Sequence, residues 1–164
     1  MEVLSGHLAI DDLDAFLGTI DTIGDRHGAT IQAFDADYVA GRRHLVRAVE
    51  AAERAVANDD AIARDPAVEI LLYAAGRRQI DRALEMGVDE GEGPAVIVVS
   101  GGDESAAVAD LHTELALEDG AVLGARDDAT LRAFFDITER EEAATDASVQ
   151  ELVCERVALL AVVK

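Results

Sequence analysis

The stretch PAVIVVS, residues 94–100, is apolar at every position between its first and last residues. Its valines and isoleucine predict a β-strand. Because apolar and polar residues do not alternate, we expect this strand to be buried on both faces, in the centre of a sheet. Shorter runs of the same character at residues 1–10 and 29–34 predict two further strands. Whatever else the chain forms must cover this small sheet.

Most of the remaining sequence has helical periodicity. One helix is expected to start near residue 11 and to stop at Gly24 or Gly28. A longer one, capped by Asp35 or Asp37, is expected to include Gly41 in its first turn and to end near residue 58. Its predicted buried stripe is Val39, Leu45, Val46, Val49 and Val56.

Proline and glycine mark the limits of the next helices. Pro66 fits a first helical position and Gly76 a left-handed C-terminal position, and a third helix is expected to start at Arg77 and to close at Gly87. Further helices are predicted in 106–117, 127–135 and 146–163. Because the middle helices follow one another without intervening strands, we predict an α+β fold. It would be a helix-rich single domain over residues 1–164, with a small mixed or antiparallel sheet of three to four strands.

The charge of the chain is strongly acidic and unevenly distributed. The net charge is -20, and of 14 basic residues only Lys164 is lysine. This pattern is typical of proteins from a salt-rich, haloarchaeal-type cytoplasm, where salt screens the self-repulsion; an acidic protein that binds basic partners is the alternative. Eight arginines and nine acidic residues lie between residues 35 and 82. An anionic partner could dock on this locally neutral segment.

The motifs of the common catalytic and metal sites are missing. The four histidines are scattered, with no metal-ligand spacing and no GxSxG elbow. VVSGGDES, residues 98–105, has the strand–glycine–helix order of a phosphate loop without its sequence pattern, and Asp103 and Glu104 would repel an anion there. We therefore expect no enzyme activity, no metal and no cofactor, and a small-molecule enzyme using this turn is the alternative. Since no apolar run approaches the roughly 20 residues of a membrane span, we expect a cytoplasmic protein that binds no membrane.

Two similar stretches carry paired arginines behind a glycine: AGRRHLVRA at 40–48 and AGRRQIDRA at 75–83. Guanidinium groups bind phosphate in bidentate fashion, helix starts favour anions, and an aromatic ring can stack on a base. On this reasoning a single-stranded RNA site is a hypothesis, and a solvated face of local ion pairs is its alternative. The candidate RNA-binding residues are Tyr73, Gly76, Arg77, Arg78, Gln79, Arg42, Arg43, His44 and Arg47.

Three segments resemble one known family. They are IQAFDADYVAGRRHLVRAVEAAERA (31–55), EILLYAAGRRQIDRALEMG (69–87) and LVCERVALLAVVK (152–164). Together they are similar to the small non-catalytic, kinase-binding subunit of the KEOPS (EKC) complex, which is related to the animal PRPK-binding protein. The resemblance covers nearly the whole chain.

The resemblance implies a function that the residues alone do not. The KEOPS complex makes threonylcarbamoyladenosine on tRNA, and this subunit would bind the small atypical kinase of the complex. It would also capture tRNA through the single-stranded 3′ CCA end, and would meet other KEOPS subunits only indirectly. The alternative within this family is a structural adaptor of the kinase that binds no RNA.

The same resemblance implies that the kinase docks on the last helix. That helix is apolar on more than one face, so one face could serve the core and another the partner. The candidate kinase-binding residues are Val149, Leu152, Val153, Arg156, Val157 and Leu160. Cys154, in the same helix, is interpreted as a small buried hydrophobic residue. This chain is more acidic than the RNA-binding relatives of that family are expected to be. Since salt weakens phosphate contacts steeply, stacking and bidentate hydrogen bonds would have to supply more of its affinity for RNA.

Overall fold

The computed structural model describes residues 1–124 and 128–163. The chain divides into two compact units, each built from two segments. The first unit comprises Met1–Ala36 and Gly87–Val122, and the second comprises Asp37–Met86 and Leu123–Lys164.

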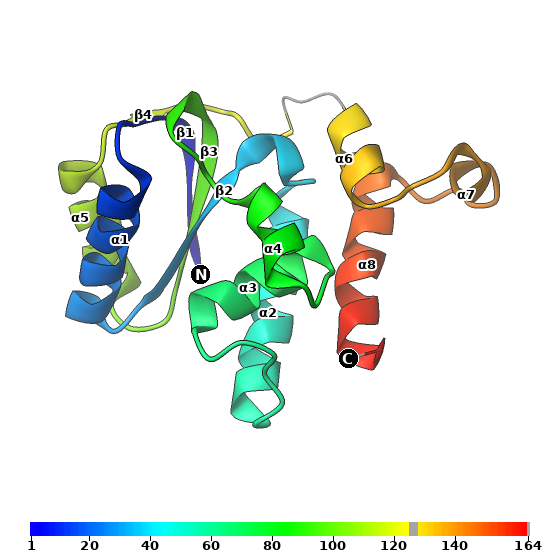
Figure 1. Cartoon of the computed structure of the whole chain (residues 1–164), viewed down its shortest axis with the longest axis horizontal. Helices are drawn as coiled ribbons and strands as arrows, with labels where there is room; N and C mark the ends of the chain where they lie inside the picture. The colour runs from blue at the N-terminus through cyan, green and yellow to red at the C-terminus, as the bar shows by residue number, and fades with distance from the viewer. Residues whose placement is uncertain (125–127, 164) are drawn as a thin grey trace. The chain divides into compact units, whose positions relative to one another are not determined.

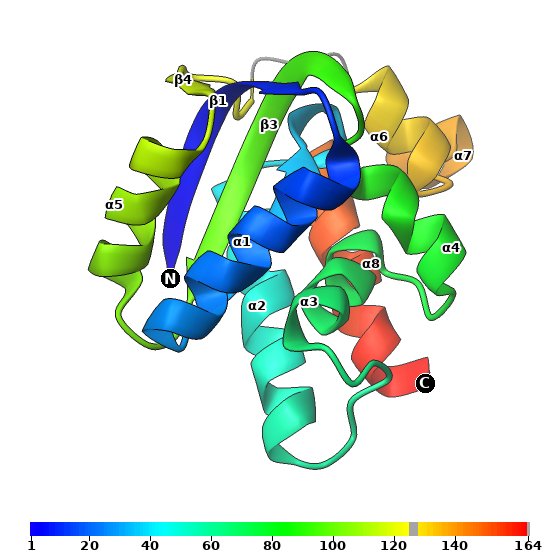
Figure 2. The ribbon, with the colours of Figure 1, turned by 60° about the vertical axis from the view of Figure 1, so that its left-hand side comes forward.

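The first unit is a four-stranded antiparallel sheet covered by two helices (Figure 1). Its strands are β1 (Glu2–Ile10), β2 (Thr30–Asp35), β3 (Gly91–Ser100) and β4 (Leu117–Asp119), in the order β2-β3-β1-β4. Helices α1 (Leu13–His27) and α5 (Glu104–Glu114) lie on one face of the sheet, as Figure 2 shows. Leucines, isoleucines and alanines of β1, β2 and β3 form a core with both helices.

The strand predicted at residues 94–100 is central in the sheet, as expected. Strand β3 pairs with β1 on one side and β2 on the other, and every side chain from Ala95 to Ser100 is buried. It begins at Gly91, three residues before the predicted start at Pro94. Helix α1 ends at Gly28, whose φ of 64° is the left-handed conformation of a C-cap, and it passes straight through Gly24.

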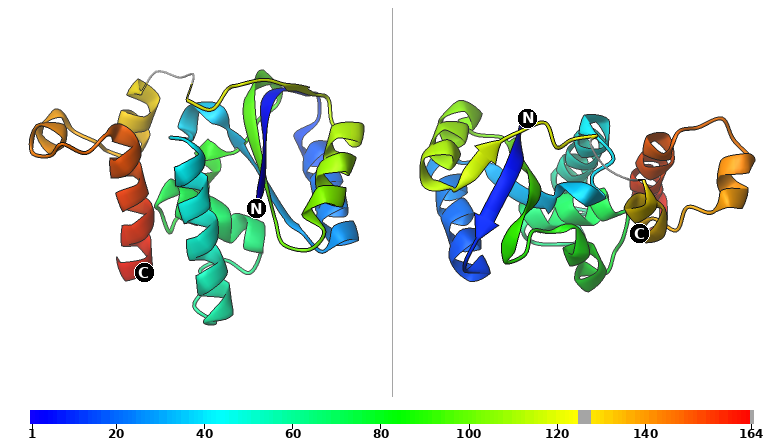
Figure 3. Two further views of the ribbon diagram at one scale, coloured as in Figure 1. Left: turned by 180° about the vertical axis from the view of Figure 1, so that it is seen from behind. Right: turned by 90° about the horizontal axis from the view of Figure 1, so that it is seen from above.

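The second unit is helical in the residues that the structure describes. Helices α2 (Arg42–Ala57) and α3 (Pro66–Ala75) pack on each other, and both contact α8 (Val149–Val163) (Figure 3). Shorter elements are the 3₁₀ turns Ala36–Tyr38 and Leu84–Met86, and the helices α4 (Ile80–Ala83), α6 (Ala129–Phe134) and α7 (Glu139–Ala143). The predicted α+β fold, rich in helix and with a small antiparallel sheet, is thus confirmed.

The start of α2 was predicted wrongly. A 3₁₀ turn follows β2, and α2 begins only at Arg42, after Gly41 at its N-cap. A Cβ atom on Gly41 would collide with the Gln150 amide, and the φ of 152° favours glycine. The buried stripe of α2 also differs from the prediction: Val46 is half-buried and Val56 is exposed, because alanines supply most of the buried face.

The prediction of a helix that starts at Arg77 is also wrong. Residues 77–79 are irregular, and α4 contains only the four residues Ile80–Ala83 before a 3₁₀ turn. The free N–H groups of a helix start are therefore not located at Arg77 and Arg78. No helix among the described residues is long and apolar enough to cross a membrane.

Candidate functional site

A buried histidine of the first arginine-bearing stretch contacts Ala74, the residue just before the second stretch. His44, in the first turn of α2, is fully buried, and its Nε2 lies 2.7 Å from the carbonyl oxygen of Ala74 in α3. Its Nδ1 accepts a hydrogen bond from the Ala40 N–H at 3.0 Å. Both contacts are satisfied by the neutral ring with its proton on Nε2. His44, which was predicted to bind RNA, therefore joins α2 to α3 inside the unit.

Gly76 and Tyr73 also contribute to the internal packing of the second unit. Gly76 is the left-handed C-cap of α3, and a Cβ atom there would lie 3.1 Å from the Cβ of Arg156. The ring of Tyr73 is 1% exposed, so it offers no face on which a base could stack. Both residues were predicted to contact RNA; Tyr73 is buried, whereas Gly76 is partly exposed and serves as the C-cap of α3.

Arg77 is held by the end of α6. Its Nη2 donates to the carbonyl oxygen of Phe134, its guanidinium carbon lies 4.8 Å from the centroid of the Phe134 ring, and the Asp136 carboxylate is 3.6 Å away. Only 19% of its side chain is exposed. Because the last carbonyls of a helix have no partner within it, Arg77 satisfies a backbone group that would otherwise be unpaired.

Arg156 has the same role from the other side. Its guanidinium donates to the carbonyl oxygen of Phe135 at 3.2 Å and binds both carboxylate oxygens of Glu141 at 2.7 Å. The hydrogen bonds from Arg156 lower the pKa of Glu141 below its usual value. Two arginines that the sequence placed on ligand surfaces thus stabilise one turn, at residues 134–136.

The other predicted RNA-binding residues remain at the surface. Arg42, Arg43 and Arg47 on α2 are exposed, as are Arg78 and Gln79 between α3 and α4. None of these four arginines forms an ion pair within the described part of the chain. The predicted RNA-binding cations that stay exposed therefore lie on α2 and in the short linker after Gly76.

The residues of α8 predicted to bind a kinase face inward. Val149, Leu152, Val153, Val157 and Leu160 are each less than a tenth exposed, and the helix contacts α2, α3 and α6. They form the core face of the helix, so the predicted docking residues other than Arg156 lie in the interior of this unit. The apolar side chains that α8 leaves in solvent are Leu159, Val162 and Val163, exposed by 45%, 79% and 66%. The sequence signal for them was the second apolar face of this helix.

A groove of about 400 Å³ lies between α2 and α8. We call it the α2–α8 groove. Its α2 side carries Arg43, Arg47 and Arg54, and its α8 side carries Glu151 and Glu155. The small residues Ala51, Ala158 and Ala161 line it, together with Val157 and Cys154. Cys154 is half-buried rather than buried, and burial raises the pKa of its thiol despite the nearby Arg43 and Arg47. The sequence reasoning missed Arg54, although it lies on the same face of α2 as Arg47.

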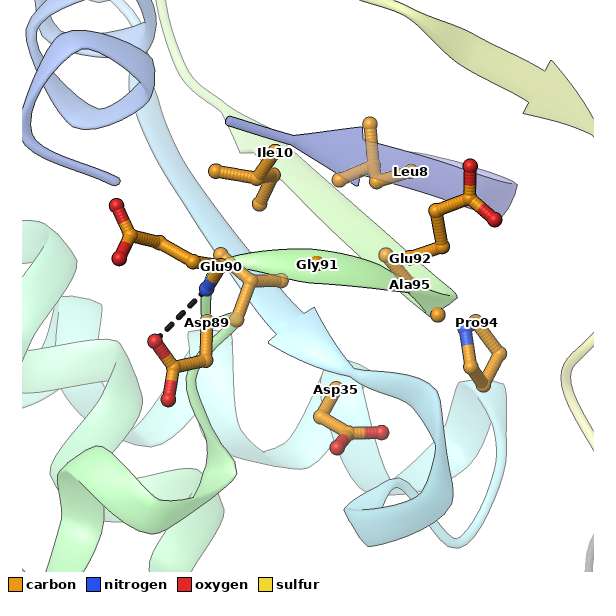
Figure 4. A pocket seen from close by; sticks show the side chains of 11 residues that line it. Leu8, Ile10, Asp35, Asp89, Glu90, Gly91, Glu92, Pro94 and Ala95 are labelled. Atoms are coloured by element: carbon orange, nitrogen blue, oxygen red, sulfur yellow. Dashed lines mark hydrogen bonds between the residues drawn. The ribbon is translucent and has the colours of Figure 1, made fainter. Parts of the chain in front are cut away.

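The first unit has a smaller pocket of about 150 Å³, drawn in Figure 4. It lies where β3 begins, and its polar side chains are the carboxylates of Asp35, Asp89, Glu90 and Glu92. Asp89 accepts a hydrogen bond from the Glu90 N–H at 2.7 Å, the dashed line in Figure 4. Throughout the described residues, no group of three or more potential ligands is arranged to hold a metal ion.

The turn after β3 is closed by its own carboxylates. Asp103 caps α5 by accepting the Ala106 N–H at 3.1 Å, and Glu104 accepts the Gly101 N–H at 2.9 Å. The Gly101 hydrogen bond is the main reason that the pKa of Glu104 is lowered. Two backbone donors that a phosphate loop would turn toward its ligand are therefore already used by carboxylates.

Comparison with known protein families identifies a family for this chain. A family model described as kinase binding protein CGI-121 matches residues 20–161. The chain belongs to the CGI-121 family. The match includes α2, α3 and nearly all of α8. A search of the curated proteins found no match.

Proposed function

We propose that this CGI-121 family chain is a non-catalytic subunit of the KEOPS complex that binds the small kinase of the complex. Membership of a family of kinase-binding proteins carries the proposal. The apolar side chains of Leu159, Val162 and Val163 support it, because exposed apolar groups that gather at one end of a helix are typical of a protein interface. In this proposal residues 1–164 act as one domain in the cytoplasm, with no cofactor.

The kinase surface that we propose is the outer face of α8. Leu159 and Val163 lie one turn apart and project from the same side of the helix. Changing both to glutamate places two charges on this face without touching the buried stripe. We expect kinase binding to weaken by about tenfold or more, as at the apolar centre of an interface.

The matched control is V56E, which introduces the same charge at an exposed valine near the end of α2. Purified full-length variants would be titrated with the kinase subunit from the same organism by calorimetry. If V56E and the L159E/V163E double variant bound the kinase equally, the outer face of α8 would not be the docking surface.

We also propose that the subunit captures tRNA by its single-stranded 3′ CCA end. The support is electrostatic: Arg42, Arg78 and Gln79 are exposed hydrogen-bond donors, and the two arginines form no ion pair with described residues. The His44 bond to Ala74 holds the start of α2 beside the end of α3, so the two arginine stretches belong to one region of the second unit. Arg43 and Arg47 are left out of this proposed RNA site, because two glutamates lie opposite them across the α2–α8 groove.

The test compares full-length tRNA with tRNA trimmed of its CCA end, in molar KCl. Loss of binding on trimming is expected for a reader of the 3′ end. The double variant R42E/R78E should weaken binding to intact tRNA by about tenfold, whereas R64E, at an exposed arginine between α2 and α3, should not. Equal binding of intact and trimmed tRNA would instead favour an adaptor that binds only the kinase.

A further inference from the structure

The α2–α8 groove has opposite charges on its two sides. Arg43, Arg47 and Arg54 stand on the α2 side and Glu151 and Glu155 on the α8 side. The three guanidiniums make no hydrogen bond or ion pair with any residue that the structure describes. Unpaired arginines gathered in one groove are unexpected in a chain whose net charge is -20, where carboxylates are plentiful. The pKa of Glu151 is lowered, mainly by hydrogen bonds with Ser148 and in smaller part by Arg43, so the glutamates of α8 balance the cationic edge of α2 only across the open groove.

The spacing of the arginines fits a helical partner. Arg43 and Arg47 are one turn apart on α2, and Arg54 lies about 10 Å further along, at a rise of 1.5 Å per residue. An acidic edge repeating along about three turns of another helix would match them. Across the groove, Glu151 and Glu155 are also one turn apart, so they can face basic residues on the opposite edge of the same helix.

The side chains between these charged edges are small. Ala158 and Ala161, three residues apart on α8, and Ala51 on α2 line the groove. Small residues allow the backbone of a third helix to approach closely, and an amphipathic helix lying in such a groove is a common mode of recognition. A nucleic acid strand fits less well, because its phosphates would meet the carboxylates of Glu151 and Glu155.

We propose that a helix of the kinase docks in the α2–α8 groove, with acidic residues along the edge that faces α2 and basic residues along the edge that faces α8. The proposal rests on the proposed kinase binding, and it names the chemistry of the kinase segment. The groove adjoins the outer face of α8 through Ala158 and Ala161, which lie beside Leu159 and Val162 in the helix.

The test uses the full-length chain with the double change R43E/R47E. We expect kinase affinity to fall by about 10- to 100-fold, because attraction becomes repulsion at two positions. R64E, alone and combined with R140E, is the control, since Arg64 and Arg140 are exposed arginines outside the groove. A second variant, A158W, fills the groove without changing charge and should weaken binding as strongly. Thermal melts and tRNA binding are measured for every variant, and both should stay close to those of the original chain.

A charge swap identifies the acidic edge. Each surface aspartate and glutamate of the kinase would be changed to arginine, and the variants titrated with R43E/R47E. At least one should restore about tenfold of the lost affinity.

If the groove variants bind the kinase normally, the docking proposal is wrong while the kinase-binding function stands. If the groove variants lose tRNA binding and retain kinase binding, the groove binds RNA and the docking proposal is wrong. If the unaltered chain does not bind the kinase, the proposed function fails.

Discussion

Arg77 and Arg78 are adjacent, chemically identical and, in the sequence, equivalent; the structure separates them. Arg77 is largely buried against the end of α6, while Arg78 is exposed and forms no ion pair with described residues. Replacing each arginine by methionine removes the guanidinium and keeps most of the aliphatic stem. We expect R77M to lower the free energy of unfolding substantially and R78M to leave it nearly unchanged.

The magnitude follows from the contacts of Arg77. A hydrogen bond from a charged donor contributes about 1.5–3 kcal/mol, and the cation–π contact with Phe134 about 0.5–2 kcal/mol. The ion pair with Asp136 adds little, because the Asp136 carboxylate is 81% exposed. The buried Nε of Arg77 has no hydrogen-bond partner among the described residues, and its desolvation opposes folding. The net loss in R77M is therefore about 2–3 kcal/mol, against less than about 0.5 kcal/mol in R78M.

Urea denaturation followed by circular dichroism measures both values. With a typical dependence on urea, the midpoint for R77M should fall by about 1–2 M and that for R78M should not move. In the tRNA assay the order should reverse, with R78M weakening binding more than R77M under conditions where both are folded. Equal midpoints for the two variants would refute the argument that Arg77 is an internal group.

Three further predictions concern stability. Glu69 is fully buried and accepts backbone N–H bonds from Ile62 and Ala63 at 2.7–3.1 Å, so E69Q should cost about 2–3 kcal/mol in urea denaturation, whereas E50Q, at an exposed glutamate of α2, should not. G76A, which forces an alanine into a left-handed conformation 3.1 Å from the Arg156 Cβ, should cost about 1–3 kcal/mol in the same assay. The His27 and Arg26 side chains lower the pKa of Asp110, so its contribution to stability is present above pH ~4 and is lost as pH falls through the lower folded pKa; D110N should flatten this part of a stability–pH curve.

Features set by local sequence were predicted correctly. The apolar run in β3, the proline that starts α3 and the glycine that ends it all act through their own neighbours, so the strand, the helix and its limits were predictable. Strand β4 was harder, because three residues, Leu117–Asp119, are too few to show alternation.

Errors arose where distant residues decide the structure. Helix α2 starts only after Gly41, where a Cβ atom would collide with the amide of Gln150, more than a hundred residues away, and no pattern near Gly41 indicates this contact. The arginines show the same limit: whether each one is free depends on partners such as Phe134 and Glu141, far along the chain. Periodicity identified α8 as an apolar helix, but only the packing shows that Leu152 faces inward and Leu159 outward.

The turn at residues 134–136 has a consequence for how two ligands would influence each other. Arg77 precedes the linker proposed to hold RNA, Arg156 belongs to the helix proposed to hold the kinase, and both bind neighbouring carbonyl groups of this turn. A shift of α8 that moved Arg156 would also displace the turn at residues 134–136, to which Arg77 is bound. Occupancy of one surface would then alter the free energy of binding at the other, and thermodynamics requires this coupling to be equal in both directions. Bound kinase would change the affinity for tRNA by the same factor by which bound tRNA changes the affinity for the kinase.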